Sequence, residues 1–298
     1  NGNANAIVGN GNAIGNGNVN RVVGNGNGIL GSENGILGSQ NTVEEKKNYL
    51  EGNSNLVGGN VNSVWGSNNN IIGDLNGVKG NQNYLQGSAN SVIGNSNGVL
   101  GDQNQWVGNQ NAVAGNQNIV GGSYNGIMGS QNLVNGNQNF VNGNSNGVIG
   151  SQNLIGGSQN AIQGNQNAIG GNQNIIKGDI NSVLGNSNVI GGNANNVYGN
   201  QNGILGNQNA VNGNQNSIAG SWNGVQGNLN GVAGNSNIVK GDSNSVRGNQ
   251  NGVAGSWNDI QGNQNGVFGN ANIVNGNQNG VNGNQNAIQG SINSVSGN

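Results

Sequence analysis

Side chains that could perform catalysis or bind metals are sparse in this 298-residue chain. It has no His and no Cys, which removes the commonest general bases, nucleophiles and transition-metal ligands. A calcium-binding roll needs a regular Asp in every repeat, and here the Asp residues do not recur in that way. The sequence therefore predicts no enzyme, no cofactor and no metal site. The Asp residues that lack this regular spacing are Asp74, Asp102, Asp179, Asp242 and Asp259.

The abundant functional group is the side-chain amide of Asn, whose chemistry is hydrogen bonding. It recurs in a heptad that residues 200–213, NQNGILGNQNAVNG, show twice. The third position is Asn, the fifth is a branched aliphatic residue and the seventh is Gly. From 18 to 297 this frame runs for forty heptads without insertion or deletion. The exceptions are Glu45 at the seventh position and Trp106 at the fifth.

The heptad does not fit a coiled coil, because it offers one dependable aliphatic position and a Gly in nearly every unit. It does fit a β-strand. The third and fifth positions are two residues apart, so they point to one face of a strand. Gly at the seventh position supplies the positive φ that a tight corner needs, and Asn, Ser or Asp at the first suits an Asx-type turn. Each heptad therefore predicts a strand of five residues and a corner.

Such short strands cannot bury an inner face alone, so the heptads must stack as coils of a solenoid. We predict an all-β, parallel β-solenoid with two heptads, or 14 residues, in each of about 20 coils. Three heptads, or 21 residues, would instead give a triangular prism. Stacking places each inward Asn above another, so that the amides bond in ladders. The predicted ladder residues include Asn20, Asn34, Asn48, Asn167, Asn181, Asn195, Asn209, Asn223, Asn237 and Asn251.

The other positions lead to more local expectations. The second, fourth and sixth positions are predicted to point outward, where large apolar side chains could contact a neighbouring molecule. Lys precedes Gly-Asp at Asp179 and at Asp242, which predicts a charge pair across each turn. Trp106 is expected to swell its coil. The outward contact candidates are Trp65, Trp222, Trp257, Phe140, Tyr198 and Phe268.

Residues 1–17 are slightly irregular, since 10–17 hold one residue more than a heptad and predict a bulged corner. Beyond them the repeat is uniform, so residues 1–298 are predicted to form a single continuous solenoid. Both ends of the sequence fall inside a repeat. We therefore expect the chain to be a segment of a longer repeat protein.

The charge balance excludes some partners. Only 5% of residues are charged and the net charge is −2, with no basic patch and no long apolar run. These features argue against nucleic acid and against membrane insertion. The one charge cluster, residues 44–47 (EEKK), replaces a corner. It is interpreted either as a docking or cleavage site or as a solvated corner that blunts lateral stacking.

In its third, fifth and seventh positions the heptad resembles the xxNxVxG β-roll of grass ice-recrystallisation-inhibition proteins, over essentially the whole chain. The resemblance implies a left-handed, two-sided β-roll with inward ladders such as Asn167, Asn181 and Asn195. It also implies ice binding by outward Thr, Ser and Val arrays on a flat face. Thr42 is the only Thr, and the two alternating heptad sets look alike, so neither side is predicted as a dedicated face. A weaker similarity is to the 14-residue coils in the heads of trimeric autotransporter adhesins.

Three functional hypotheses follow. The first is a structural protein that forms a rigid extracellular fibre or surface stalk. The alternative is an ice-binding or ice-recrystallisation-inhibition protein, and the third is an adhesin or glycan-binding module that uses Trp222 and Trp257. A coil with unpaired backbone groups at its edge invites pairing, so self-association end to end or laterally is expected. The predicted location is extracellular or at the cell surface, with ice or a glycan as further partners.

Overall fold

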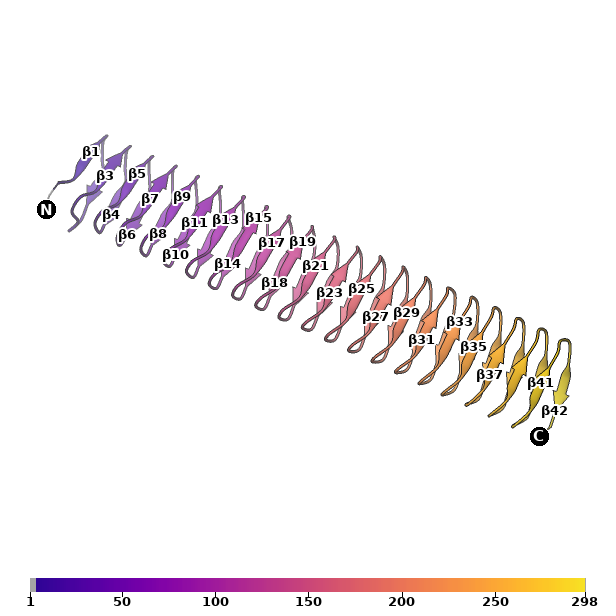
Figure 1. The fold of residues 1–298 in the computed structure, drawn as a ribbon. Coiled ribbons are helices and arrows are strands. Elements are labelled where there is room, and N and C mark those ends of the chain that lie inside the picture. Colours follow the sequence, from indigo (N-terminus) through magenta and orange to yellow (C-terminus); the bar gives the residue numbers. More distant parts are fainter. Residues whose placement is uncertain (1–3, 298) are drawn as a thin grey trace. The chain divides into compact units, whose positions relative to one another are not determined.

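The computed structural model describes residues 4–297, in which the only regular element is the β-strand. The 42 strands are each three residues long, except for the two-residue β2. None of the described residues belongs to a helix, and so none forms a helix able to cross a membrane. In Figure 1 successive strands alternate between the two sides of each coil.

The odd-numbered strands lie on one side of the coils: β1 Ala6–Val8, β3 Arg21–Val23, β5 Gly35–Leu37, β7 Tyr49–Glu51, β9 Ser63–Trp65, β11 Gly77–Lys79, β13 Ser91–Ile93, β15 Gln105–Val107, β17 Ile119–Gly121, β19 Leu133–Asn135, β21 Gly147–Ile149, β23 Ala161–Gln163, β25 Ile175–Lys177, β27 Val189–Gly191, β29 Gly203–Leu205, β31 Ser217–Ala219, β33 Gly231–Ala233, β35 Ser245–Arg247, β37 Asp259–Gln261, β39 Ile273–Asn275 and β41 Ala287–Gln289.

The even-numbered strands lie on the other side: β2 Ala13–Ile14, β4 Gly28–Leu30, β6 Thr42–Glu44, β8 Leu56–Gly58, β10 Asn70–Ile72, β12 Tyr84–Gln86, β14 Gly98–Leu100, β16 Ala112–Ala114, β18 Gly126–Met128, β20 Phe140–Asn142, β22 Leu154–Gly156, β24 Ala168–Gly170, β26 Ser182–Leu184, β28 Asn196–Tyr198, β30 Ala210–Asn212, β32 Gly224–Gln226, β34 Ile238–Lys240, β36 Gly252–Ala254, β38 Gly266–Phe268, β40 Gly280–Asn282 and β42 Ser294–Ser296.

The strands pair in parallel with the strand two places along. Gly77 of β11 pairs with Ser91 of β13, and Tyr84 of β12 pairs with Gly98 of β14. Both offsets are 14 residues, so each coil consists of two heptads, and the 21-residue alternative is wrong. The prediction of a parallel β-solenoid is confirmed, with about 21 turns.

The chain divides into two compact units, Asn1–Gly147 and Val148–Asn298. Each unit has the same 14-residue coil, with an odd-numbered and an even-numbered strand on its two sides. The prediction of a single continuous solenoid and that of a left-handed coil both stay predictions.

The strands are shorter than the five residues expected from the sequence, because the second heptad position belongs to the corner. That position adopts φ near +60° in almost every repeat, as Gln166 does with φ 58°. Left-handed backbone cannot continue a strand, so the strand consists of positions four to six alone.

The corner requires Gly at the seventh position for two reasons. Gly164 has φ 143°, which L-residues rarely adopt. In addition, a Cβ atom on Gly164 would overlap the carbonyl group of Gly178 in the next coil. Successive coils therefore approach each other closely at these corners, where the lack of a Cβ atom leaves room for the contact. The one exception, Glu45, adopts a different φ of 75°.

The interior contains the aliphatic fifth position and the Asn third position. Each Asn is bonded to the coils on both sides. The Asn181 backbone N–H and Nδ2 donate to Asn167 Oδ1 at 2.9 and 3.1 Å, and Asn167 Nδ2 donates to Gly178 O at 2.9 Å. The ladder prediction is thus confirmed. The ten named ladder residues are all at most 1% exposed: Asn20, Asn34, Asn48, Asn167, Asn181, Asn195, Asn209, Asn223, Asn237 and Asn251.

A second ladder, not predicted, lies at the first position. The Asn60 N–H donates to Asp74 Oδ1 at 2.6 Å, and the Ser88 N–H donates to Asp102 Oδ1 at 2.7 Å. The expected Asx-type turn does not form, because the N–H two residues further on already donates to an inner Asn, as that of Asn62 does to Asn48. The first position therefore selects Asn, Ser or Asp because each has an acceptor oxygen within two bonds of Cβ.

The irregular start behaves as predicted over its described part. Ala13 pairs with Gly28, an offset of 15, whereas the Asn18 N–H donates to Ser32 Oγ at an offset of 14. The extra residue therefore lies in the corner after β2, which is the shortest strand. Residues 1–3 lie outside the described residues.

Trp106 fits the interior without disturbing the strand pairing. Its side chain is 2% exposed, and it pairs in register with Val92 on one side and Val120 on the other. Its indole N–H has no hydrogen-bond partner in the described structure. The register is thus maintained at this position.

The substitution Asn167→Leu should lower the free energy of unfolding by about 3 kcal/mol, because it leaves two donors of Asn181 and the carbonyl of Gly178 unpaired in the interior. The isosteric Asn167→Asp should also destabilise, since it removes both Nδ2 donors. Urea unfolding followed by far-ultraviolet circular dichroism measures the change.

The matched control for this prediction is Gln166→Leu, next in sequence but exposed in the corner. Leu75 and Leu229 already occupy the same heptad position with positive φ, so the change should cost less than about 0.5 kcal/mol. Equal effects of the two Leu substitutions would contradict the ladder's role in stability.

The substitution Glu45→Gly should raise the free energy of unfolding by about 1 kcal/mol. Glu45 is the only non-Gly residue among the forty seventh positions, and it has φ 75°. Gly would relieve this left-handed strain, and the same urea experiment detects the gain. The control is Glu44→Gly, at the exposed end of β6 where no positive φ is required; the idea fails if that variant gains as much.

Candidate functional site

Each coil presents two outward surfaces, formed by the fourth and sixth heptad positions. We call them the odd-strand face and the even-strand face after the strands that form them. Positions on a face are fixed by the parallel register, so Gly77 and Lys79 of β11 stand beside Ser91 and Ile93 of β13. Any site on a face is therefore a pattern of side chains on successive strands about 4.8 Å apart.

Charge distinguishes the two faces in both units. The even-strand face has one charged residue in each unit, Glu44 in the first and Lys240 in the second. The odd-strand face has three in each unit. The even-strand face is consequently uncharged from β8 to β20 in the first unit and from β22 to β32 in the second. The six charged residues of the odd-strand face are Arg21, Glu51, Lys79, Lys177, Arg247 and Asp259.

The even-strand face of the first unit is hollowed where small residues follow one another. Gly98, Ala112 and Gly126 occupy the fourth position on three successive even strands, with Tyr84 before them and Phe140 after them. The resulting open hollow has a volume of about 420 Å³ and an almost wholly apolar lining. It is a shallow depression between two aromatic side chains.

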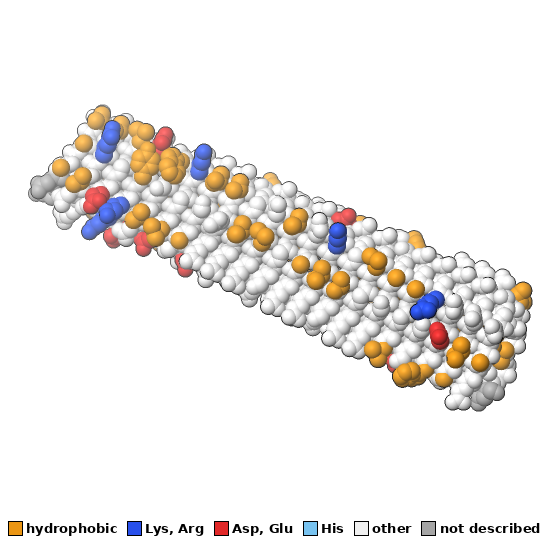
Figure 2. Space-filling model, in the orientation of Figure 1, with side chains coloured by type: hydrophobic (Ala, Val, Ile, Leu, Met, Phe, Trp, Pro, Cys, Tyr) orange, Lys and Arg blue, Asp and Glu red, His pale blue; other side chains and the backbone are white. Residues whose placement is uncertain are grey.

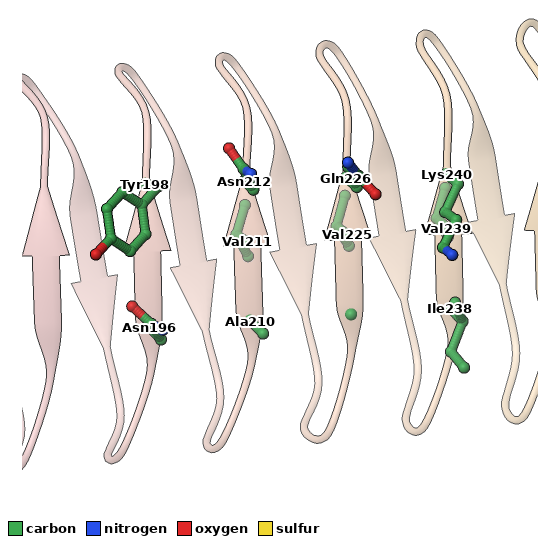
Figure 3. A pocket seen from close by; sticks show the side chains of 11 residues that line it. Asn196, Tyr198, Ala210, Val211, Asn212, Val225, Gln226, Ile238, Val239 and Lys240 are labelled. Carbon is green, nitrogen blue, oxygen red and sulfur yellow. The ribbon is translucent and has the colours of Figure 1, made fainter.

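The second unit has a comparable hollow on its even-strand face, also of about 420 Å³. Figure 3 shows Tyr198 at one end and Lys240 at the other, with Asn212 and Gln226 between them. This lining is more polar than that of the first unit. Both hollows are open to solvent, and neither has two ionisable side chains on neighbouring strands, since Tyr198 and Lys240 are three even strands apart. They therefore suit a surface contact better than catalysis.

The predicted outward aromatic residues are exposed but do not form one site. Trp65 lies on the odd-strand face, whereas Phe140 and Phe268 lie on the even-strand face. Trp222 and Trp257 are 61% and 71% exposed in corners, one preceding an even strand and the other an odd strand. A single glycan site that uses both Trp222 and Trp257 is therefore not formed within the chain.

The charge pairs expected across two turns are wrong. Asp179 Oδ1 accepts from the Asn165 N–H at 2.7 Å, and Asp242 Oδ1 accepts likewise from Asn228. Both Asp residues serve the first-position ladder, in which a carboxylate replaces an amide oxygen. The ion pair found among residues 4–297 joins Lys47 Nζ and Glu33 Oε2 at 3.9 Å.

The charge cluster at residues 44–47 forms an exposed corner. Glu45 takes the place of Gly, and its carbonyl accepts from Asn34 Nδ2 at 2.9 Å, so the inner ladder continues past it. Lys47 bridges to Glu33 in the preceding coil, and both side chains are more than half exposed. These contacts agree with the solvated-corner interpretation. No group of three metal-ligating side chains occurs within residues 4–297.

The difference between the faces was not predicted, although the sequence contains a signal for it. The two alternating heptad sets look alike in sequence, so neither side is predicted as a dedicated face. The signal is the charged residues of alternate heptads, of which each unit has one on its even strands and three on its odd strands. Charged corner residues such as Lys47 obscure this signal until the strand boundaries are known.

A family model described as grass antifreeze beta roll matches residues 73–164, 156–241 and 225–298. The three overlapping matches together span residues 73–298, well over half of the chain. No match to a curated protein was found. The matched range includes most of the uncharged stretch in the first unit and all of that in the second.

Proposed function

The chain belongs to the grass antifreeze beta-roll family, and from this we propose that it binds ice through its even-strand face and inhibits ice recrystallisation. The family match is the observation that supports the function. The distribution of charge selects the face. Ice binding was the alternative hypothesis from the sequence, and the match favours it over the structural fibre.

A charge-free face suits contact with ice for a physical reason. An ionised side chain orients its own hydration water, and moving it to a less hydrated contact is costly. Small apolar groups and neutral amides impose no such shell. On the even-strand face such amides include Asn142 and Asn212, beside small residues such as Ala112 and Ala210. Water held there is free to adopt the order of a crystal surface.

A rigid backbone supports the same proposal. Each coil is bonded to the next through both Asn ladders and through the strand pairing. The outward groups of a face therefore repeat at the strand spacing of about 4.8 Å over many coils. A regular, rigid array loses little conformational entropy on contact with a regular solid surface. The expected Thr array is not needed for this argument, since Thr42 is the only Thr.

The test places charges on one face at a time. We expect the triple variant Ala168→Lys, Ser182→Lys, Ala210→Lys, on the even-strand face of the second unit, to raise the protein concentration needed to arrest recrystallisation by about tenfold. All three residues are exposed at the fourth heptad position. Recrystallisation of a thin ice film in sucrose solution provides the measurement.

The matched control is Ala161→Lys, Ser217→Lys, Ala287→Lys on the odd-strand face of the same unit. It changes the same residue types, at the same heptad position and with the same exposure. We expect a change of less than about twofold. If the wild type has no activity, the function is wrong. If both triple variants lose activity alike, the choice of face is wrong.

Self-association is a separate proposal, supported by exposed apolar side chains such as Phe140 at 43% and Phe268 at 62% exposure. We expect the purified chain to form larger particles as its concentration rises, because burying such side chains is favourable. Multi-angle light scattering measures this. A stable 29.8 kDa monomer over the whole concentration range would contradict it. The fibre and the extracellular location stay predictions.

A further inference from the structure

The odd-strand face of the first unit has a patch that differs from the rest of the surface. It extends from β3 to β11 and includes Arg21, Tyr49, Glu51, Trp65 and Lys79, which we call the aromatic patch. Four of its five residues precede residue 73, where the family match begins. Figure 2 shows hydrophobic side chains gathered near the N-terminal end, with basic and acidic side chains around them.

The centre of the aromatic patch is a pair of aromatic rings. Tyr49 on β7 and Trp65 on β9 lie on neighbouring strands, with ring centroids 5.8 Å apart and planes inclined by 51°. Their side chains are 43% and 42% exposed. The pair therefore supports itself by ring contact while leaving a substantial part of each ring accessible to a ligand.

Charged hydrogen-bonding groups border the Trp65 ring on both sides. The register places Glu51 of β7 directly beside Trp65, and Lys79 of β11 directly beside it on the other strand. Trp65 thus stands between a carboxylate and an ammonium group. Neither charged group belongs to the ion pair found among residues 4–297. Both remain available to bond a ligand that rests on the indole.

A hollow adjoins the tyrosine ring. Arg21, Gly35 and Tyr49 occupy the fourth position on three successive odd strands. Between Arg21 and Tyr49 lies a hollow of about 210 Å³, which Leu37 also lines. Gly35 keeps its floor open, since a Cβ there would lie 3.3 Å from Tyr49 Cδ2. The hollow therefore has an aromatic wall, a guanidinium group and an apolar border.

We propose that the aromatic patch binds an uncharged, extended glycan. The C–H face of a pyranose ring is apolar and stacks on an aromatic ring, while its hydroxyl groups project from the ring edge. Those hydroxyls need donors and acceptors at the rim of the aromatic surface, which Arg21, Lys79 and Glu51 supply as charge-assisted partners. Successive strands repeat these groups at about 4.8 Å, so consecutive sugars can use Tyr49 and Trp65.

The charges favour a neutral glycan over the other ligands that an aromatic surface might attract. Cations and an anion lie within the same patch, so it presents no single-sign surface for a polyanion such as nucleic acid. Docking of a second copy would bury three charged side chains without partners, which is costly. A bound sugar would leave these charged side chains partly hydrated, and its hydroxyl groups would form hydrogen bonds with them.

The test is titration calorimetry on the full chain with neutral hexasaccharides of β-linked glucose, xylose and N-acetylglucosamine. We expect at least one to bind, with an affinity that changes little between low and high salt. Trp65→Ala and Tyr49→Ala should each weaken binding by about tenfold, whereas Trp65→Phe should retain most of it. Circular dichroism checks that each variant keeps its β-structure.

Two matched controls remove an exposed aromatic residue elsewhere, Trp222→Ala in a corner and Tyr198→Ala on the even-strand face. Neither should change the affinity by more than about twofold. The proposal is overturned if no hexasaccharide binds at up to about 10 mM. It also fails if Trp65→Ala binds normally, if Trp222→Ala has an equal effect, or if only acidic glycans bind. Ice recrystallisation inhibition by Trp65→Ala should equal that of the wild type, so the two proposals fail independently.

Discussion

The hydrogen bonding of the buried Asn amide is the interaction on which the rest of the structure depends. In Asn167, Oδ1 accepts two bonds from Asn181, while Nδ2 donates to Asn153 and to Gly178. The amide is therefore fully satisfied without water, which a buried polar group requires. Because these bonds run along the stack, the buried amides of every coil need the neighbouring coils as hydrogen-bond partners. An interior of one Asn and one aliphatic residue per heptad thereby replaces the thick hydrophobic core that a 14-residue coil is too small to contain.

The corners make the outer surface regular, because they fix which side chains of each heptad point outward. Gly at the seventh position and a left-handed residue at the second confine the strand to three residues. Side chains at the fourth and sixth positions are then the only ones on the faces, and parallel pairing without slippage aligns them in columns. The residues at these outward positions differ from coil to coil while the register stays the same, so a substitution there is expected to change one point of a column and leave the fold intact. The scaffold thus separates stability, which is internal, from surface chemistry, which varies freely.

The surface contains two kinds of chemistry within this one scaffold. The even-strand face combines small residues, amides and apolar groups with almost no charge, which suits contact with ordered water. The aromatic patch combines two rings with three charged groups in a stretch that lies mostly before the family match. The same strand spacing underlies both, but a crystal surface requires uniform repetition, whereas a glycan requires a local group of unlike side chains. Their different positions allow both to be used by one molecule.

The sequence by itself determined the coil. Asn at the third position of each heptad, an aliphatic residue at the fifth and Gly at the seventh predict stacked β-coils that bury the amide, and the extra residue among 10–17 interrupts the seven-residue count. The choice between 14 and 21 residues per coil came from the observed strand register. Trp106 could be identified as inward from its position alone. The coil prediction holds because it depends on local stereochemistry repeated forty times, so that a wrong register would fail everywhere, and the same repeat gives the frame in which the extra residue and Trp106 are recognised. The resemblance to the grass β-roll had the same basis.

Only the tertiary structure decided what the outward residues do. Gln166 forms part of a corner and does not begin a strand, because its φ is 58°, which the sequence does not specify, and so the five-residue strand was wrong. Asp179 and Asp242 bond a backbone 14 residues away, not the nearby Lys, because stacking brings that N–H closer. The charge-poor face and the Tyr49–Trp65 pair exist only once alternate heptads are assigned to opposite sides. The repeated heptad determines how the chain coils. A surface site, in contrast, consists of outward residues 14 or more positions apart in sequence, which become neighbours only in the folded coil.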